Sequence, residues 1–153
     1  RQPRARLILV GSGPAAQALQ ARQPAAVFCG PRSGPFLAEH YASGDLFLFP
    51  SLTETYGNVV AEALASGLPV VAYRDAAARE LIEHQVHGWL AEPGDEAAFV
   101  AGAVALAEAP ELRSRQRLAA RERVASLAWQ AIVERLVTLQ RQVILSSPVT
   151  ARR

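Results

Sequence analysis

Residues 50–72 read PSLTETYGNVVAEALASGLPVVA, and the apolar run Leu46–Phe49 comes directly before them. Apolar side chains recur at helical spacing between Tyr56 and Ser66, Gly67 is a typical helix-ending residue, and 69–73 is a second apolar run. Strands that are apolar throughout and joined by a helix are typical of a parallel sheet covered on both faces, with right-handed crossovers. The stretch therefore predicts a strand–helix–strand unit of an α/β domain.

The same alternation continues on both sides of this unit. Strands are expected at 6–10, 26–29, 46–49, 69–73 and 88–91. Helices are expected at 15–22, 35–43, 56–66, 76–84, 96–108, 111–125 and 127–144, and Asp95 is a candidate N-cap. We therefore expect a Rossmann-like, three-layer α/β domain with a parallel sheet of about five strands over residues 1–145, followed by a frayed tail over 146–153.

The composition is that of an ordinary globular domain, with half of the residues apolar and a fifth charged. The lone cysteine, Cys29, excludes a disulfide framework and a Cys-based zinc site, and it favours a reducing, cytoplasmic compartment. The net charge of +2 is due to four arginines at the two ends of the chain. Without them, twelve arginines and fourteen acidic residues would give a net charge of −2. A polybasic nucleic-acid surface is therefore not expected. A membrane span is excluded too, since there is no run of eighteen apolar residues.

The first candidate site is the loop GSGPAA, which starts at Gly11 and includes Gly13. It fits the dinucleotide fingerprint G-x-G-x-x-A after a strand. The acid that should end the second strand and hold a ribose is missing, and Pro14 removes a backbone amide. An NAD-binding domain thus remains an alternative, beside a simple tight turn.

The second candidate site is the loop before the helix that starts near Gly57. The free amides and positive dipole end of that helix favour an anion, most naturally a phosphate. Glu54 precedes the helix and Glu62 lies eight residues further on, so the two carboxylates flank the anion site. Carboxylates accept hydrogen bonds from sugar hydroxyls, which suits a nucleotide with a sugar at each end. Alternatively, Glu54 complements the helix dipole and Glu62 is a solvated helix residue.

These residues closely resemble a known family. Glu54-x7-Glu62 is preceded by LILVGSGP, VFCG and YASGDLFLFP and is followed by AAARELI and HGWLAEPGD. The pattern, over about residues 6–108, is similar to the donor-binding C-terminal half of family 4 (group 1) retaining glycosyltransferases of GT-B fold. The resemblance implies transfer of a hexose from a UDP- or GDP-linked sugar to a lipid-linked or glycan acceptor, as in the synthesis of cell-envelope polysaccharides. It implies no metal and no cofactor besides the donor.

The resemblance also implies roles for individual residues. Glu54, the candidate catalytic residue, would hold hydroxyls of the donor sugar, and Glu62 would bind the ribose. The diphosphate and sugar would meet the amides of Tyr56, Gly57, Asn58 and Val59. The base pocket would be walled by Cys29, Gly30 and Pro31, and the turn with Gly11 and Gly13 would face the cleft between the two halves of the enzyme.

Two departures from the family pattern shape the expectations. The Arg and Lys that hold the diphosphate belong to a segment before LILVGSGP, and this chain contains no Lys. The acceptor-binding N-terminal domain is missing as well, so we expect a monomeric fragment that transfers nothing alone.

The whole enzyme would be cytoplasmic, with a peripheral position at the inner face of the membrane as an option. The other alternative is a non-catalytic nucleotide-binding module.

The remaining polar residues suggest ordinary structural roles. His40, His84 and His87 match no metal-site spacing and are expected at the surface or at helix ends. Arg79 and Glu80 follow the fourth expected strand and are expected to form an exposed ion pair.

Overall fold

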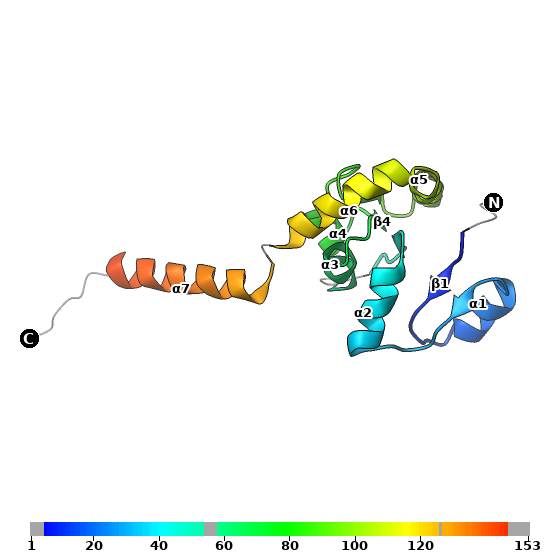
Figure 1. Cartoon of the computed structure of the whole chain (residues 1–153), viewed down its shortest axis with the longest axis horizontal. Helices are drawn as coiled ribbons and strands as arrows, with labels where there is room; N and C mark the ends of the chain where they lie inside the picture. Colours follow the sequence, from blue (N-terminus) through cyan, green and yellow to red (C-terminus); the bar gives the residue numbers. More distant parts are fainter. Residues whose placement is uncertain (1–4, 54–57, 126, 147–153) are drawn as a thin grey trace, which may run out of the picture.

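A computed structural model of the chain describes residues 5–53, 58–125 and 127–146 (Figure 1). Strands and helices alternate as far as residue 108, and two more helices follow. The strands are β1 (Ile8–Leu9), β2 (Val27–Phe28), β3 (Phe47–Phe49), β4 (Val70–Tyr73) and β5 (Gly88–Ala91). The helices are α1 (Ala16–Arg22), α2 (Gly34–Ser43), α3 (Asn58–Ala65), α4 (Ala76–Leu81), α5 (Glu96–Glu108), α6 (Pro110–Ala125) and α7 (Trp129–Ser146). Every expected element is present, and β5 and α5 have the expected bounds.

The five strands pair in parallel, but they form two ladders. β1 pairs with β2, while β3, β4 and β5 form a three-stranded sheet in that order. The α/β class and the parallel pairing are confirmed, whereas a single continuous sheet is not what the described residues form. The reason is length: β1 and β2 have two residues each, and Ile8 and Val27 remain half exposed. Such short strands offer few backbone hydrogen bonds and little apolar surface to join them to β3.

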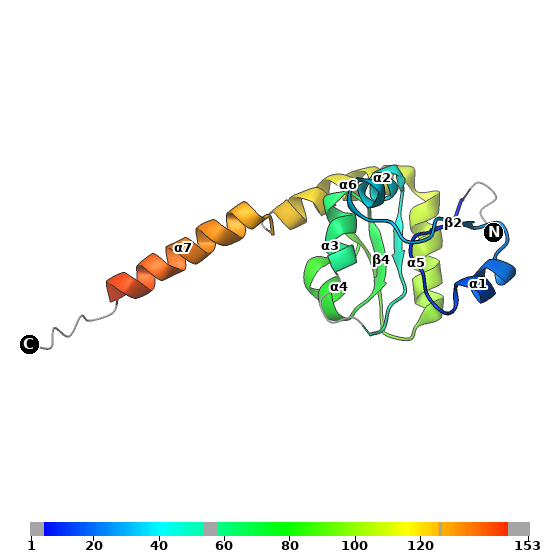
Figure 2. The same ribbon diagram turned by 90° about the horizontal axis from the view of Figure 1, so that it is seen from below.

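The core lies on both faces of β4, which is buried throughout. Val70 and Ala72 belong to a cluster with side chains from α3, α4 and α6. Val71 and Tyr73 point the other way, into a cluster with Phe99 and Leu106 of α5. Figure 2 shows the resulting layers, with α3 and α4 on one side of β4 and α5 on the other. The expected three-layer arrangement is therefore confirmed.

Local capping explains why α5 begins and α3 ends near the residues that the sequence predicts. The Asp95 carboxylate accepts a hydrogen bond from the backbone N–H of Ala98, which caps α5 at 2.9 Å. At the end of α3, Gly67 has φ +78°, and the N–H of Leu68 reaches back to the carbonyl of Ala63. This is a Schellman motif, and glycine suits its left-handed position because it has no Cβ.

Helix α6 joins the helices of the domain through three arginines. Arg113 donates to carbonyls at the end of α5, Arg121 to the carbonyl of Ser66 just after α3, and Arg123 to the last carbonyls of α4. A cation at a helix C-terminus satisfies free carbonyls and complements the negative end of the dipole. α6 therefore stabilises the ends of the three helices that precede it in the chain.

Helix α7 leaves the body of the domain and runs outward, as both views show (Figures 1 and 2). The apolar stripe that the sequence predicts is exposed along its length: Ile132, Val133, Leu136, Leu139 and Val143. None of the helices in the described residues combines the length and apolarity that crossing a bilayer requires. Of the predicted tail over 146–153, Ser146 is the last residue of α7 and the rest lies outside the described residues.

Candidate functional site

The loops after β1 and β2 lie side by side. The backbone N–H of Gly11 donates to the carbonyl of Gly30 at 2.9 Å, and both glycines have positive φ, +135° and +67°. Gly13 follows in open space, with no atom within 4 Å of a Cβ built on it. Cys29 is half buried beside Gly30, and Pro31 is exposed. The structure thus brings together the glycine loop and the loop expected to wall the base pocket.

The second group of predicted residues lies on α3. Asn58 is the first residue of this helix and is exposed, and Val59 packs against the core cluster under α3. The side chain of Val59 is therefore structural, which leaves its backbone amide for a ligand. Glu62 lies one turn further along and is exposed. The remaining predicted residues of this loop lie outside the described residues: Glu54, Tyr56 and Gly57.

The carboxylate of Glu62 has a partner that the sequence did not indicate. The hydroxyl of Tyr41, on α2, donates to Glu62 Oε2 at 3.1 Å. Burial raises the pKa of Tyr41 to about 12, and the nearby charge of Glu62 and this hydrogen bond act in the same direction. A phenol is protonated at neutral pH even at its ordinary pKa of about 10, and the upward shift extends this range to more alkaline solution, so the hydroxyl remains a donor to the carboxylate.

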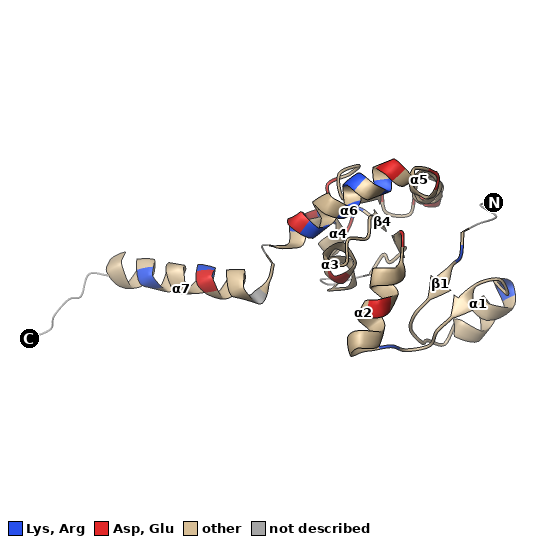
Figure 3. Ribbon diagram, in the orientation of Figure 1, with Lys and Arg blue, Asp and Glu red and all other residues tan. Residues whose placement is uncertain are grey.

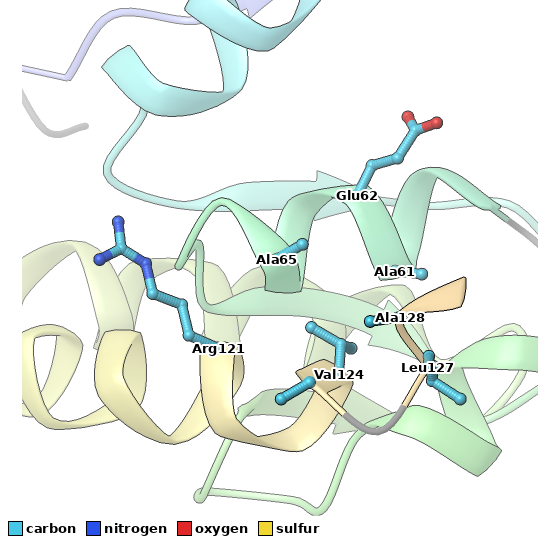
Figure 4. A pocket seen from close by; sticks show the side chains of 8 residues that line it. Ala61, Glu62, Ala65, Arg121, Val124, Leu127 and Ala128 are labelled. Carbon is cyan, nitrogen blue, oxygen red and sulfur yellow. The ribbon is translucent and has the colours of Figure 1, made fainter. Parts of the chain in front are cut away.

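An open groove of about 430 Å³ runs between α3 and α6, with Glu62 on its rim (Figure 4). Arg121 stands at the other end, and the lining between them consists of apolar side chains: Ala61, Ala65, Val124, Ala125, Leu127 and Ala128. Such a wall has few groups that could hydrogen-bond a diphosphate. Of the predicted site residues that the structure describes, only Glu62 lines this groove, and the others lie at the loops after β1 and β2 and at the start of α3.

A larger and more polar groove, about 720 Å³, lies against the outer side of α4. Its lining is Arg74, Arg79, Glu80, Ile82, Glu83, His84, His87 and Arg123. The expected pair of Arg79 and Glu80 is present at 3.7 Å, and both side chains are exposed. Arg74 is paired with Glu92 at 2.9 Å. The cations of this groove are thus already occupied by acids or, for Arg123, by backbone carbonyls.

One histidine in this groove departs from the expectation. His87 is buried, with 8% of its surface exposed, and its Nδ1 accepts the backbone N–H of Glu83 at 3.0 Å. The interpretation of His87 as a surface or helix-end residue is therefore wrong. Burial lowers the pKa of His87, the charge of Arg123 lowers it further, and Glu83 opposes the shift. The neutral ring holds the turn between α4 and β5.

Charges of both signs occur along α6 and α7 (Figure 3). The predicted site residues that the structure describes fall into two groups, the glycine loops after β1 and β2 and the residues Asn58, Val59 and Glu62 of α3, where Tyr41 of α2 joins Glu62. No hydrogen bond or ion pair among the described residues joins the two groups. A ligand that contacts both groups would have to bridge the two ladders.

Three comparisons relate this chain to known proteins. The family model described as "Glycosyl transferases group 1" matches residues 1–109. The chain is 41% identical over 132 residues to a GDP-mannose-dependent alpha-mannosyltransferase of Mycobacterium tuberculosis, which covers 86% of this chain and 34% of that protein. It is 38% identical over 140 residues to the sulfoquinovosyl transferase SQD2 of Arabidopsis thaliana, covering 88% of this chain and 27% of that protein. The chain thus spans no more than about a third of these relatives.

Solved structures share the fold. Anabaena Alr3699/HepE in complex with UDP superposes with a TM-score of 0.72 at 27% identity, covering 89% of this chain and 42% of that one. The sucrose-phosphate synthase of Thermosynechococcus elongatus superposes with a TM-score of 0.79 at 27% identity, covering 92% and 39%. The similarity again covers less than half of the longer chain.

Proposed function

The chain belongs to the group 1 glycosyltransferases, with the GT-B fold, and we propose that it is the donor-binding half of a retaining enzyme. The enzyme would move a hexose from a nucleoside-diphosphate sugar to a lipid-linked or glycan acceptor. Glu54 would hold hydroxyls of the sugar, and Glu62 would accept hydrogen bonds from the ribose.

The observation that carries this proposal is the exposure of the Glu62 carboxylate and the hydrogen bond that it accepts from Tyr41. It is exposed on the helix that follows β3, and among the described residues it takes part in no ion pair. A phenol holds one of its oxygens, and a carboxylate has room for about four hydrogen bonds. Glu62 therefore keeps acceptor capacity for a diol, and the hydrogen bond from Tyr41 holds its carboxylate in one place.

Other predicted residues would complete the donor site. The amides of Asn58 and Val59 lie in the first turn of α3, where the helix dipole favours a diphosphate. The adjacent loops with Gly11 and Gly30 would face the base and the cleft between the halves. A helix end, rather than a metal, would then balance part of the phosphate charge.

Relatives and neighbours support a nucleotide-sugar donor. The name of one relative specifies GDP-mannose, and a structural neighbour was solved with UDP and with UDP-glucose. We therefore propose a UDP- or GDP-linked hexose as donor. We further propose that the acceptor-binding half lies outside these 153 residues and that this chain alone transfers no sugar. The full-length enzyme would work in the cytoplasm, in the synthesis of envelope polysaccharides.

A binding panel tests the proposal. Calorimetry with UDP, GDP and NAD should show that the full-length protein binds UDP or GDP more tightly than NAD, and this chain should bind the same nucleotide more weakly. Tighter binding of NAD would instead favour the dinucleotide alternative at the loop that starts with Gly11. Sugar transfer by this chain alone would contradict the two-half arrangement.

A further inference from the structure

Tyr41 joins two helices that are separated in the sequence. It lies on α2, its hydroxyl is 3.1 Å from Oε2 of Glu62 on α3, and 21 residues separate the two. Its ring packs against Phe47 of β3, with the ring centroids 5.7 Å apart at an angle of 58°. The ring is thus fixed by the core and by β3, and only the hydroxyl reaches the carboxylate.

The carboxylate itself has little else to hold it. Glu62 is exposed, and the neighbouring side chains along this flank of α3 are the methyl groups of Ala61 and Ala65 (Figure 4). A glutamate in such surroundings samples several rotamers, and fixing one of them costs conformational entropy whenever a ligand binds. The hydrogen bond from Tyr41 restricts these rotamers before the ligand arrives.

The chemistry of the Tyr41–Glu62 pair suits a carboxylate that accepts hydrogen bonds from the two hydroxyls of a diol. A protonated phenol can only donate to a carboxylate, and a tyrosine keeps its proton throughout the physiological range even at its ordinary pKa of about 10. The hydrogen bond uses one lone pair of Oε2. The second lone pair of Oε2 and both lone pairs of Oε1 remain for ligand hydroxyls.

We propose that Tyr41 is a positioning residue for donor recognition: its hydroxyl fixes the Glu62 carboxylate in the orientation that accepts both hydroxyls of the 2′,3′-diol of a ribonucleotide. This inference rests on the proposed role of Glu62 as the ribose-binding residue. It adds a specificity, because the pair would discriminate ribonucleotides from analogues without the diol. It also assigns to α2 a part in binding.

The test is Tyr41→Phe in the full-length protein, which removes the hydroxyl and keeps the ring on Phe47. Calorimetry would measure the Kd of UDP or GDP, whichever the parent protein binds more tightly, and of its 2′,3′-dideoxy analogue. The matched control is Tyr73→Phe, since Tyr73 packs on Phe99 in the cluster on the opposite face of β4. The same pair of measurements is repeated in a Glu62→Ala background.

Tyr41→Phe should weaken binding of the ribonucleotide by about threefold to tenfold, the range expected for one hydrogen bond of ordinary strength. The dideoxy analogue should bind the variant as it binds the parent protein. Tyr73→Phe should change neither affinity. In the Glu62→Ala background, loss of the Tyr41 hydroxyl should have no further effect, because the group that it positions is gone.

Other outcomes overturn the inference. Unchanged ribonucleotide affinity in Tyr41→Phe, together with weak binding by Glu62→Ala, rejects the role of Tyr41 and leaves the proposed function intact. If Tyr41→Phe weakens binding of the dideoxy analogue as much as binding of the ribonucleotide, Tyr41 acts through the fold and not through the diol. The same conclusion holds if Tyr41→Phe still weakens ribonucleotide binding in the Glu62→Ala background. Normal affinity in Glu62→Ala rejects the proposed role of Glu62, and the inference fails with it.

Discussion

The indole of Trp89, on β5, lies so close to Gly102 of α5 that a Cβ built on Gly102 would be 2.3 Å from its Cδ1. Glycine in the middle of a helix is unfavourable by about 1 kcal/mol relative to alanine. Here the missing side chain allows the helix to approach the sheet. The contact belongs to the cluster that contains Val71 and Phe99.

Replacing Gly102 with alanine should therefore destabilise the domain, although alanine favours helix. The overlap must be relieved by moving Trp89 or α5, which we expect to cost about 1–3 kcal/mol, more than the gain in helix propensity. Urea denaturation measures the difference. Gly13→Ala is the control, because a Cβ there meets nothing within 4 Å, and it should change stability by less than about 0.5 kcal/mol. Greater stability of Gly102→Ala would contradict the close approach.

Arg123 should contribute to stability through backbone carbonyls. It donates to the carbonyl of Glu80 at 2.6 Å and to that of Leu81 at 3.2 Å, at the end of α4. Arg123→Met keeps much of the aliphatic stem and removes both hydrogen bonds, so we expect a loss of about 1–2 kcal/mol in unfolding free energy. Arg115→Met, at an exposed position of the same helix, should have almost no effect. Equal stability of the two variants would show that the caps on α4 contribute nothing.

His87 should make stability depend on pH. Because its pKa in the folded protein is lowered from 6.5, the unfolded chain binds more protons in mildly acidic solution. The contribution of the neutral His87 ring to the free energy of unfolding is fully present above about pH 6.5. It is lost as the pH falls from there through the lowered pKa. His87→Asn keeps an acceptor for the N–H of Glu83 and should flatten the decline. Chemical denaturation between pH 7.5 and 5 tests this, and identical slopes in the two proteins would reject the role of His87.

Glu62→Ala should weaken the binding of UDP or GDP to the full-length protein by about 1–3 kcal/mol, because charge-assisted hydrogen bonds to the ribose are lost. The melting temperature should hardly change, since Glu62 is exposed. Glu39→Ala, at an exposed position on α2, is the control for removing one negative charge. Unchanged nucleotide affinity in Glu62→Ala would mean that this carboxylate is a solvated helix residue.

Glu54→Gln should separate contact with the sugar from contact with the nucleotide. If Glu54 holds donor-sugar hydroxyls, free UDP or GDP should bind nearly as before. Transfer by the full-length enzyme should fall tenfold or more, about 1.4 kcal/mol, because the reacting carbon is no longer well positioned. If Glu54 only complements the helix dipole, Glu54→Gln should instead lower the free energy of unfolding by about 0.3–1 kcal/mol and leave turnover normal. Steady-state kinetics and a thermal melt on this one variant distinguish the two.

The order and type of the elements follow from local patterns in the sequence. Apolar runs and helical spacing identified each strand and helix, and the bounds of α5 match because Asp95 caps it within its own first turn. Gly67 likewise ends α3 through hydrogen bonds to residues a few positions before it. The resemblance to the glycosyltransferases rests on the same kind of information, short motifs in a given order, and the family is confirmed.

Other features could not be predicted from such patterns. The expected sheet is divided into two ladders, because nothing local to the two-residue strands β1 and β2 sets which further strand they join. His87 was expected at the surface or at a helix end, but it is buried, and Arg123 of α6 lies near it from a distant part of the chain. The apolar stripe of α7 was visible in the sequence, whereas its exposure away from the domain was not.

By itself, the sequence determined the α/β class, the positions of the helices and strands, the family, and the two glutamates that define the candidate donor site. Only the tertiary structure decided that Tyr41 holds Glu62, that Trp89 requires glycine at 102, and that His87 is buried. The physical reason is the range of the forces involved. Periodicity, caps and turns act within a few residues, whereas burial and hydrogen bonds between distant segments exist only after the chain has closed the loops that bring those segments together.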